Sequence, residues 1–127
     1  MDVTRTRSSV LSRLDPWAPP LVLMAVIFAL SAQPDLSSGL GIWDTIGRKA
    51  LHMTEYALLC FLWWRAVRDL FPGRGAIAVA AAAALLYAVS DEVHQTFVDG
   101  RHGTPVDVAI DSVGIAAASL LIARRTC

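Results

Sequence analysis

This chain has few cysteines, few charged residues and no formal net charge. Its 127 residues include 2 cysteines, Cys60 in an apolar stretch and Cys127 at the end, which predict neither a disulfide framework nor a C-x-x-C metal site. The 11 basic side chains are balanced by 11 acidic ones, which argues against the basic surface of a nucleic-acid-binding protein. Charged residues make up 17% and hydrophobic residues 55%, so the composition lies on the apolar side of ordinary soluble domains.

A cleavage signal is also missing from the beginning of the chain. Arg5, Arg7 and Arg13 form a basic start, but no A-x-A sequence follows the first apolar stretch. We therefore expect that stretch to be a retained signal-anchor helix rather than a cleaved signal peptide. The length of the chain predicts one domain.

Four apolar stretches predict an all-α protein. They cover about residues 17–33, 48–70, 75–97 and 105–123, with residues 35–44 as the longest loop. A membrane-spanning helix needs about 20 largely apolar residues, and the second and fourth stretches reach that length only by including charged positions. Taken alone, these two could belong to a soluble helical bundle. However, residues 75–90 carry no charge and therefore show no solvated face.

The distribution of basic residues favours four membrane spans with both termini in the cytoplasm. With this threading, the cytoplasmic side holds eight arginines: Arg5, Arg7, Arg13, Arg65, Arg68, Arg74, Arg124 and Arg125. The outer side holds three basic residues, Arg48, Lys49 and Arg101. This asymmetry follows the positive-inside rule. We predict a four-transmembrane-helix bundle, with residues 1–16 as a cytoplasmic segment and residues 17–125 as one domain.

The same threading gathers the polar residues of three spans near the outer surface. They are Lys49, His52, Glu55 and Tyr56 in the second span, Tyr87, Ser90, Asp91, Glu92, His94 and Gln95 in the third, Arg101 and His102 in the next loop, and Asp107 and Asp111 in the fourth. Most recur at spacings of three or four residues, so each span presents them on one helical face. A carboxylate at the centre of a membrane helix costs roughly 2.5–3.5 kcal/mol, so these groups must face inward and share protons or partners.

A purely structural interpretation is also open for many of these residues. Asp107, Asp111 and Arg101 could form an ion-pair network that holds the helices together. His52 and His94 could make structural hydrogen bonds, and Tyr56 and Tyr87 could be packing residues. Intramembrane ionisable groups nevertheless indicate a functional site by default.

Four sequence blocks resemble the VanZ-like family, whose founding member is linked to teicoplanin resistance. They are Ser31-Ala32-Gln33-Pro34, Lys49-x-x-His52-x-x-Glu55-Tyr56, Tyr87-x-x-Ser90-Asp91-Glu92-x-His94-Gln95 with Phe97 and Gly100-Arg101, and Asp107-x-x-x-Asp111-x-x-Gly114. Asp99 departs from the pattern, because family members often carry proline before Gly-Arg. The resemblance covers about residues 28–122 and implies a polytopic bacterial membrane protein with a role in the cell envelope.

The first functional hypothesis is a site that engages a ligand. Lys49, Arg101, His52 and His94 could hold a phosphate or carboxylate, although the many carboxylates are a poor lining for an anion site. Membrane lipids, lipid-linked wall precursors and lipoglycopeptides are the ligands expected at the outer leaflet. The predicted binding residues are Lys49, Glu55, Tyr56, Tyr87, Gln95, Arg101, Asp107 and Asp111.

The second hypothesis is an intramembrane hydrolase or transferase acting on a lipid-linked substrate. Its candidate catalytic residues are Glu92, His94, Asp91 and His52, with Glu92 and His94 as an acid–base pair. The candidate ligands of a divalent metal, zinc or manganese, are His52, His94, Asp91 and Asp111. The spacing is not that of H-E-x-x-H.

The third hypothesis is a proton-coupled transporter, because acids and histidines in a membrane also form proton relays. Four helices are few for alternating access unless the protein forms a homodimer, for which the Ala80–Ala84 face could serve. The inner halves of the spans offer no acid for a relay that reaches both sides.

Overall fold

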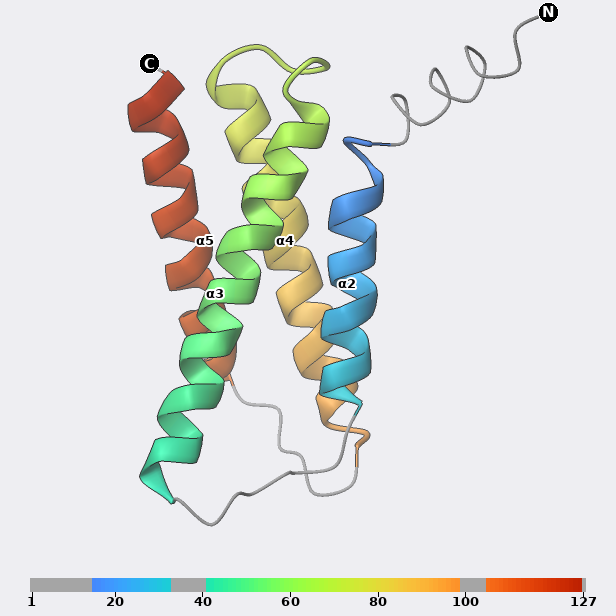
Figure 1. The fold of residues 1–127 in the computed structure, drawn as a ribbon, viewed down its shortest axis with the longest axis vertical. Coiled ribbons are helices and arrows are strands. Elements are labelled where there is room, and N and C mark those ends of the chain that lie inside the picture. Colours follow the sequence, from blue (N-terminus) through green and yellow to red (C-terminus); the bar gives the residue numbers. More distant parts are fainter. Residues whose placement is uncertain (1–14, 33–40, 99–104, 127) are drawn as a thin grey trace, which may run out of the picture.

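Helices make up most of the part of the chain that the structure describes (Figure 1). The computed structural model describes residues 15–32, 41–98 and 105–126, and within these ranges it contains four helices and no strand. They are α2 (Ala18–Ser31), α3 (Ile42–Val67), α4 (Arg74–Gln95) and α5 (Pro105–Thr126). The all-α prediction is confirmed.

The largest difference from the predicted boundaries is at the beginning of α3. This helix begins at Ile42 rather than near residue 48, so residues 42–44, which were predicted as loop, are helical. Gly41, with a positive φ of 62°, precedes the first helical residue. Asp44 lies in the first turn, where its negative charge is favourable beside the helix N-terminus. The serines and glycines between residues 37 and 41 had indicated a loop, but residues 42–44 suit the start of a helix.

The helices run alternately up and down, so each end of the bundle collects particular segments (Figure 1). The end of α2, the beginning of α3, the end of α4 and the beginning of α5 lie together, and we call this the polar end. The opposite end holds the beginning of α2, the connection between α3 and α4, and the end of α5. We call it the basic end because Arg65, Arg68, Arg74, Arg124 and Arg125 lie there.

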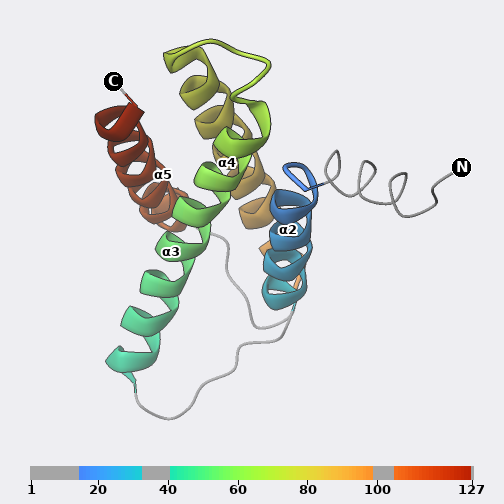
Figure 2. The same cartoon turned by 45° about the horizontal axis from the view of Figure 1, so that its top comes forward.

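Helices α3, α4 and α5 pack against one another, and α2 packs on α3 and α4. Figure 2, like Figure 1, shows the first turns of α3 reaching farther than the other helices at the polar end. A 26-residue helix is about 39 Å long, which exceeds the thickness of the hydrocarbon core of a bilayer, about 30 Å.

A stripe of alanines lets the helices approach closely at the centre. Ala76, Ala80, Ala84 and Ala88 recur every four residues on α4 and are at most 1% exposed. Three of them join a core that also contains Ile27, Tyr56, Leu59, Cys60, Ile115 and Ala118. The close packing predicted from the alanine run is thus present within the chain. Ala80 and Ala84 are buried there, whereas Ala82 of the same run is exposed.

Two helices in the described part of the chain, α4 and α5, are long and apolar enough to cross a membrane. Helix α2 is apolar but has only 14 residues, and α3 carries several charges along its length. Large apolar side chains remain exposed on all four helices, for example Leu21, Leu58, Leu86 and Leu120. Such continuous exposure of apolar side chains is unusual for a soluble monomer.

Candidate functional site

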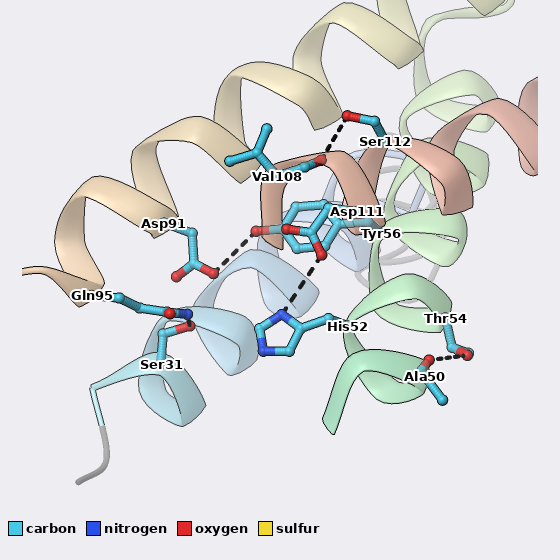
Figure 3. Close-up of polar contacts among 10 residues, drawn as sticks. All are labelled: Ser31, Ala50, His52, Thr54, Tyr56, Asp91, Gln95, Val108, Asp111 and Ser112. Atoms are coloured by element: carbon cyan, nitrogen blue, oxygen red, sulfur yellow. Dashed lines mark hydrogen bonds and ion pairs between the residues drawn. The ribbon is translucent and has the colours of Figure 1, made fainter. Parts of the chain in front are cut away.

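Five of the polar residues predicted to converge, His52, Tyr56, Asp91, Gln95 and Asp111, lie close together at the polar end of the bundle (Figure 3). Asp91, Gln95 and Asp111 are at most 5% exposed, and Glu92 is 9% exposed. Tyr56, from α3, is fully buried among them. We call Tyr56, His52, Asp91, Gln95, Asp111 and Ser31 the polar cluster, which draws on all four helices.

The approach of α5 to α3 depends on Gly114. A Cβ atom placed on Gly114 would overlap the backbone carbonyl of Met53, so only glycine allows the two helices to come this close. Met53 is the neighbour of His52, and Asp111 lies one turn before Gly114 on α5. The glycine of the D-x-x-x-D-x-x-G block therefore brings Asp111 to His52.

His52 and Asp111 form the first contact of the cluster. The His52 Nδ1 lies 3.8 Å from the Asp111 Oδ1, and the side chains are 25% and 2% exposed. This separation is within ion-pair range but is longer than a hydrogen bond. Figure 3 shows the imidazole of His52 pointing from α3 toward the carboxylate on α5. His52 is thus the more accessible member of the pair.

Tyr56 and Asp91 form the second contact. The Tyr56 hydroxyl donates a hydrogen bond of 3.2 Å to the Asp91 Oδ2, joining α3 to α4. One turn of α3 separates Tyr56 from His52, so the same helical face contacts an aspartate on each of two neighbouring helices (Figure 3). The predicted convergence of the three helical faces is therefore real for these four residues.

The end of α2 completes the cluster through Ser31. The Gln95 Nε2 donates to the Ser31 Oγ over 3.4 Å, and Ser31 is 2% exposed. Ser31 was not among the predicted site residues, although it opens the first of the four sequence blocks. That block was a signal that could have found it. A lone serine at the end of an apolar helix otherwise has little to distinguish it.

Several buried polar atoms of this region have no hydrogen-bond partner in the described part of the chain. They are the Asp91 Oδ1, the Asp111 Oδ1 and the His94 Nδ1. An unpaired buried polar group costs about 1–3 kcal/mol, and such groups in native proteins call for an explanation. Two of the three atoms are carboxylate oxygens, which accept hydrogen bonds or bind cations.

His94, the candidate acid–base partner of Glu92, lies against α2. His94 stacks on Phe28 of α2, with ring centroids 4.3 Å apart, and residues two apart on a helix do not face each other. Glu92 is buried and has other interactions. Tyr87 also turns toward α2, because its hydroxyl donates to the backbone carbonyl of Met24. This position of Tyr87 agrees with the packing alternative.

The remaining predicted residues lie around the cluster. Lys49, Glu55 and Asp107 are partly buried, and Asp107 has further interactions. Arg101 and His102, in the predicted loop, fall outside the described residues.

The metal ligands predicted from sequence do not come together as a set. In the ranges that the structure describes, no three His, Cys, Asp or Glu side chains are grouped so that they could hold a metal ion. His52 is beside Asp111, Asp91 accepts from Tyr56, and His94 is stacked on α2. A structural metal site would need more ligands than one pair supplies.

Long apolar helices around a buried polar cluster define a class: small, all-helical, membrane-associated proteins. The chain matches the VanZ/LLP1 family model over residues 3–125, which is nearly its whole length, and it belongs to this family. The resemblance in the four sequence blocks is thereby confirmed. No curated protein and no solved structure matches the chain.

Proposed function

We propose that this chain is a multi-pass protein of the bacterial plasma membrane whose polar cluster binds an envelope ligand from the outer side. The ligand is an envelope lipid, a lipid-linked wall precursor or a lipoglycopeptide. The observation that carries the proposal is the pair of buried aspartates, Asp91 and Asp111, each with an oxygen that accepts no hydrogen bond in the described part of the chain.

Exposed apolar surface supports four membrane spans. Large apolar side chains cover the outside of every helix, and a bilayer would surround them as it surrounds other transmembrane bundles. Most charges of α3 lie toward its two ends, with Arg48 and Lys49 near one end and Arg65 near the other, and Glu55 between them is partly buried. Helix α2 has 14 residues, about 21 Å, and a short span is accommodated by local thinning of the bilayer.

The arginines support the orientation. Arg65, Arg68, Arg74, Arg124 and Arg125 are all at the basic end, whereas the polar end holds Arg48 and Lys49 among the described residues. The positive-inside rule places the basic end in the cytoplasm. The polar cluster then lies at the level of the outer leaflet.

The chemistry of the cluster favours a ligand that donates hydrogen bonds. Its two atoms that lack a hydrogen bond in the described part of the chain are carboxylate oxygens, which accept hydrogen bonds and attract cations but repel phosphate. Hydroxyl groups of a sugar and amino groups of a peptide or headgroup fit this lining. Lipid-linked wall precursors and lipoglycopeptides carry both, and ethanolamine headgroups carry an amine.

Binding by the purified protein tests this proposal. The probes are a polyprenyl-linked disaccharide peptide, teicoplanin and phosphatidylethanolamine, each titrated in detergent. Asp111→Asn keeps the shape of the side chain but removes its charge, and we expect it to weaken binding of the preferred probe about tenfold or more. Asp69→Asn is the matched control, because Asp69 is exposed near the opposite end of the bundle. The proposal fails if none of the probes binds, or if Asp111→Asn binds as wild type does.

A hydrolase or transferase is the second candidate, favoured by the His52–Asp111 pair. A carboxylate beside one imidazole nitrogen orients the ring and supports the other nitrogen as a general base. The 25% exposure of His52 leaves this ring able to meet a substrate. Product release from the polyprenyl-linked probe over time, abolished by His52→Gln while binding is retained, would favour the enzyme. Stable, unchanged probe would favour the binding protein.

A further inference from the structure

A separate apolar groove lies between α3 and α5, toward the basic end. Its cavity volume is about 520 Å³. Ala57 and Ala117 leave space between the helices, Phe61 and Trp64 form one wall, and Leu121 forms the other. The groove shares no residue with the polar cluster.

One end of the groove is cationic. Arg125 lines it directly. The guanidinium of Arg68 lies 5.4 Å from the centre of the Trp64 ring, so a second arginine is held beside the aromatic wall by a cation–π contact. Acidic groups are fewer here: Asp15 pairs with Arg65 at 2.6 Å, and Asp69 is exposed. An apolar channel that ends at arginines is complementary to a molecule with an apolar chain and an anionic head.

We infer that this groove binds an anionic phospholipid of the cytoplasmic leaflet, with one acyl chain between α3 and α5 and its phosphate at Arg125. Basic pockets between transmembrane helices on the cytoplasmic side are suited to such headgroups. The guanidinium of arginine can donate two parallel hydrogen bonds to phosphate oxygens. The inference rests on the membrane arrangement proposed above but not on the polar cluster.

A second copy of the chain is the alternative occupant of the groove. A helix from another copy would fill the apolar part of the groove but would leave Arg125 without an anion, unless it brought an acid to that level. The acids of α3, α4 and α5 lie mainly toward the polar end. A phospholipid satisfies both parts of the groove, because its acyl chain contacts the apolar walls and its phosphate contacts the arginine.

Lipid binding to the full chain in detergent, followed by native mass spectrometry, tests the inference. The probes are dioleoylphosphatidylglycerol and dioleoylphosphatidylcholine, which have the same chains but differ in net charge. Wild type should bind the anionic lipid preferentially. Arg125→Gln should weaken binding of the anionic lipid about fivefold and binding of the zwitterionic lipid less, because the charge of choline offsets that of its phosphate. Arg124→Gln is the matched control, because Arg124 does not line the groove, and it should behave as wild type.

Filling the groove gives an independent variant. Ala117 is exposed, so Ala117→Phe should occupy the groove without disturbing the core and should reduce binding of both lipids. Circular dichroism and gel filtration confirm that each variant is folded. Equal binding of the anionic lipid by wild type and Arg125→Gln would overturn the inference. So would loss of a dimer, rather than of lipid, in Ala117→Phe.

The two proposals fail in different ways. If the chain is not an integral membrane protein, it will be extracted from membranes without detergent, and the membrane arrangement itself is wrong. If it is integral but shows no preference for the anionic lipid, only the groove inference is wrong. Asp111→Asn should leave lipid binding at the groove unchanged.

Discussion

Replacing Gly114 with alanine should separate α5 from α3 and destabilise the bundle. The added methyl group would overlap the carbonyl of Met53. Backbone cannot rotate away as a flexible side chain can, so one of the helices must move. This movement would also draw Asp111 away from His52. The His52 Nδ1 and the Asp111 Oδ1 are 3.8 Å apart.

The size of the effect follows from the kind of overlap. Overpacking of a close-packed interior costs about 1–3 kcal/mol, and overlap with backbone belongs at the upper end of that range. Alanine returns up to about 1 kcal/mol through its better helix propensity. We therefore expect the free energy of unfolding to fall by about 2 kcal/mol for Gly114→Ala.

Gly47→Ala is the matched control for this prediction. Gly47 also lies within a helix, but a Cβ atom there would meet nothing within 4 Å, so the variant should be at least as stable as wild type. Unfolding is measured by titrating the detergent-solubilised protein with sodium dodecyl sulfate and following circular dichroism and tryptophan fluorescence. If Gly114→Ala unfolds at the same denaturant concentration as wild type, the close approach of α3 and α5 is wrong.

Two further substitutions test individual contacts by the same unfolding assay. Tyr56→Phe removes the only donor that Asp91 has in the described part of the chain, and it should lower the free energy of unfolding by about 1–3 kcal/mol; an unchanged stability would show that this hydrogen bond is not formed. Asp15→Ala breaks a pair with Arg65 whose side chains are 69% and 35% exposed, so the loss should be below about 1 kcal/mol. A larger loss would contradict the description of the Asp15–Arg65 contact as a surface ion pair.

The helices and the level of the polar residues could be predicted from the sequence because both follow from local patterns. Apolar stretches determine where helices lie, and spacings of three and four residues determine which side chains share a face. The alanine run on α4 likewise predicted close packing, and the structure buries Ala80 and Ala84 completely. The start of α3 was predicted too late because the serines and glycines before it indicated a loop that extended to Asp44, although Asp44 is favourable in a first helical turn.

The pairing of side chains across helices could not be predicted in the same way. A shared face does not indicate which neighbour it meets, since that depends on the rotation and separation of whole helices. Tyr56 was expected to be a packing residue or a ligand contact, and its hydroxyl holds Asp91. His94 was expected beside the acids, but it stacks on Phe28. Gly114 belonged to a sequence block, yet its contact with Met53 is visible only in three dimensions.

The most direct test of the central claim is the side of the membrane on which the polar end lies. Phe97, 82% exposed, marks the polar end, and Leu70, 65% exposed, marks the basic end. Each is replaced by cysteine in a chain in which Cys127 is serine, and Cys60 stays silent because it is buried. Spheroplasts are then treated with a membrane-impermeant maleimide before and after lysis. The account predicts that Phe97→Cys is labelled in intact spheroplasts and Leu70→Cys only after lysis. The reverse pattern, or equal labelling of both before lysis, would contradict an outward-facing site.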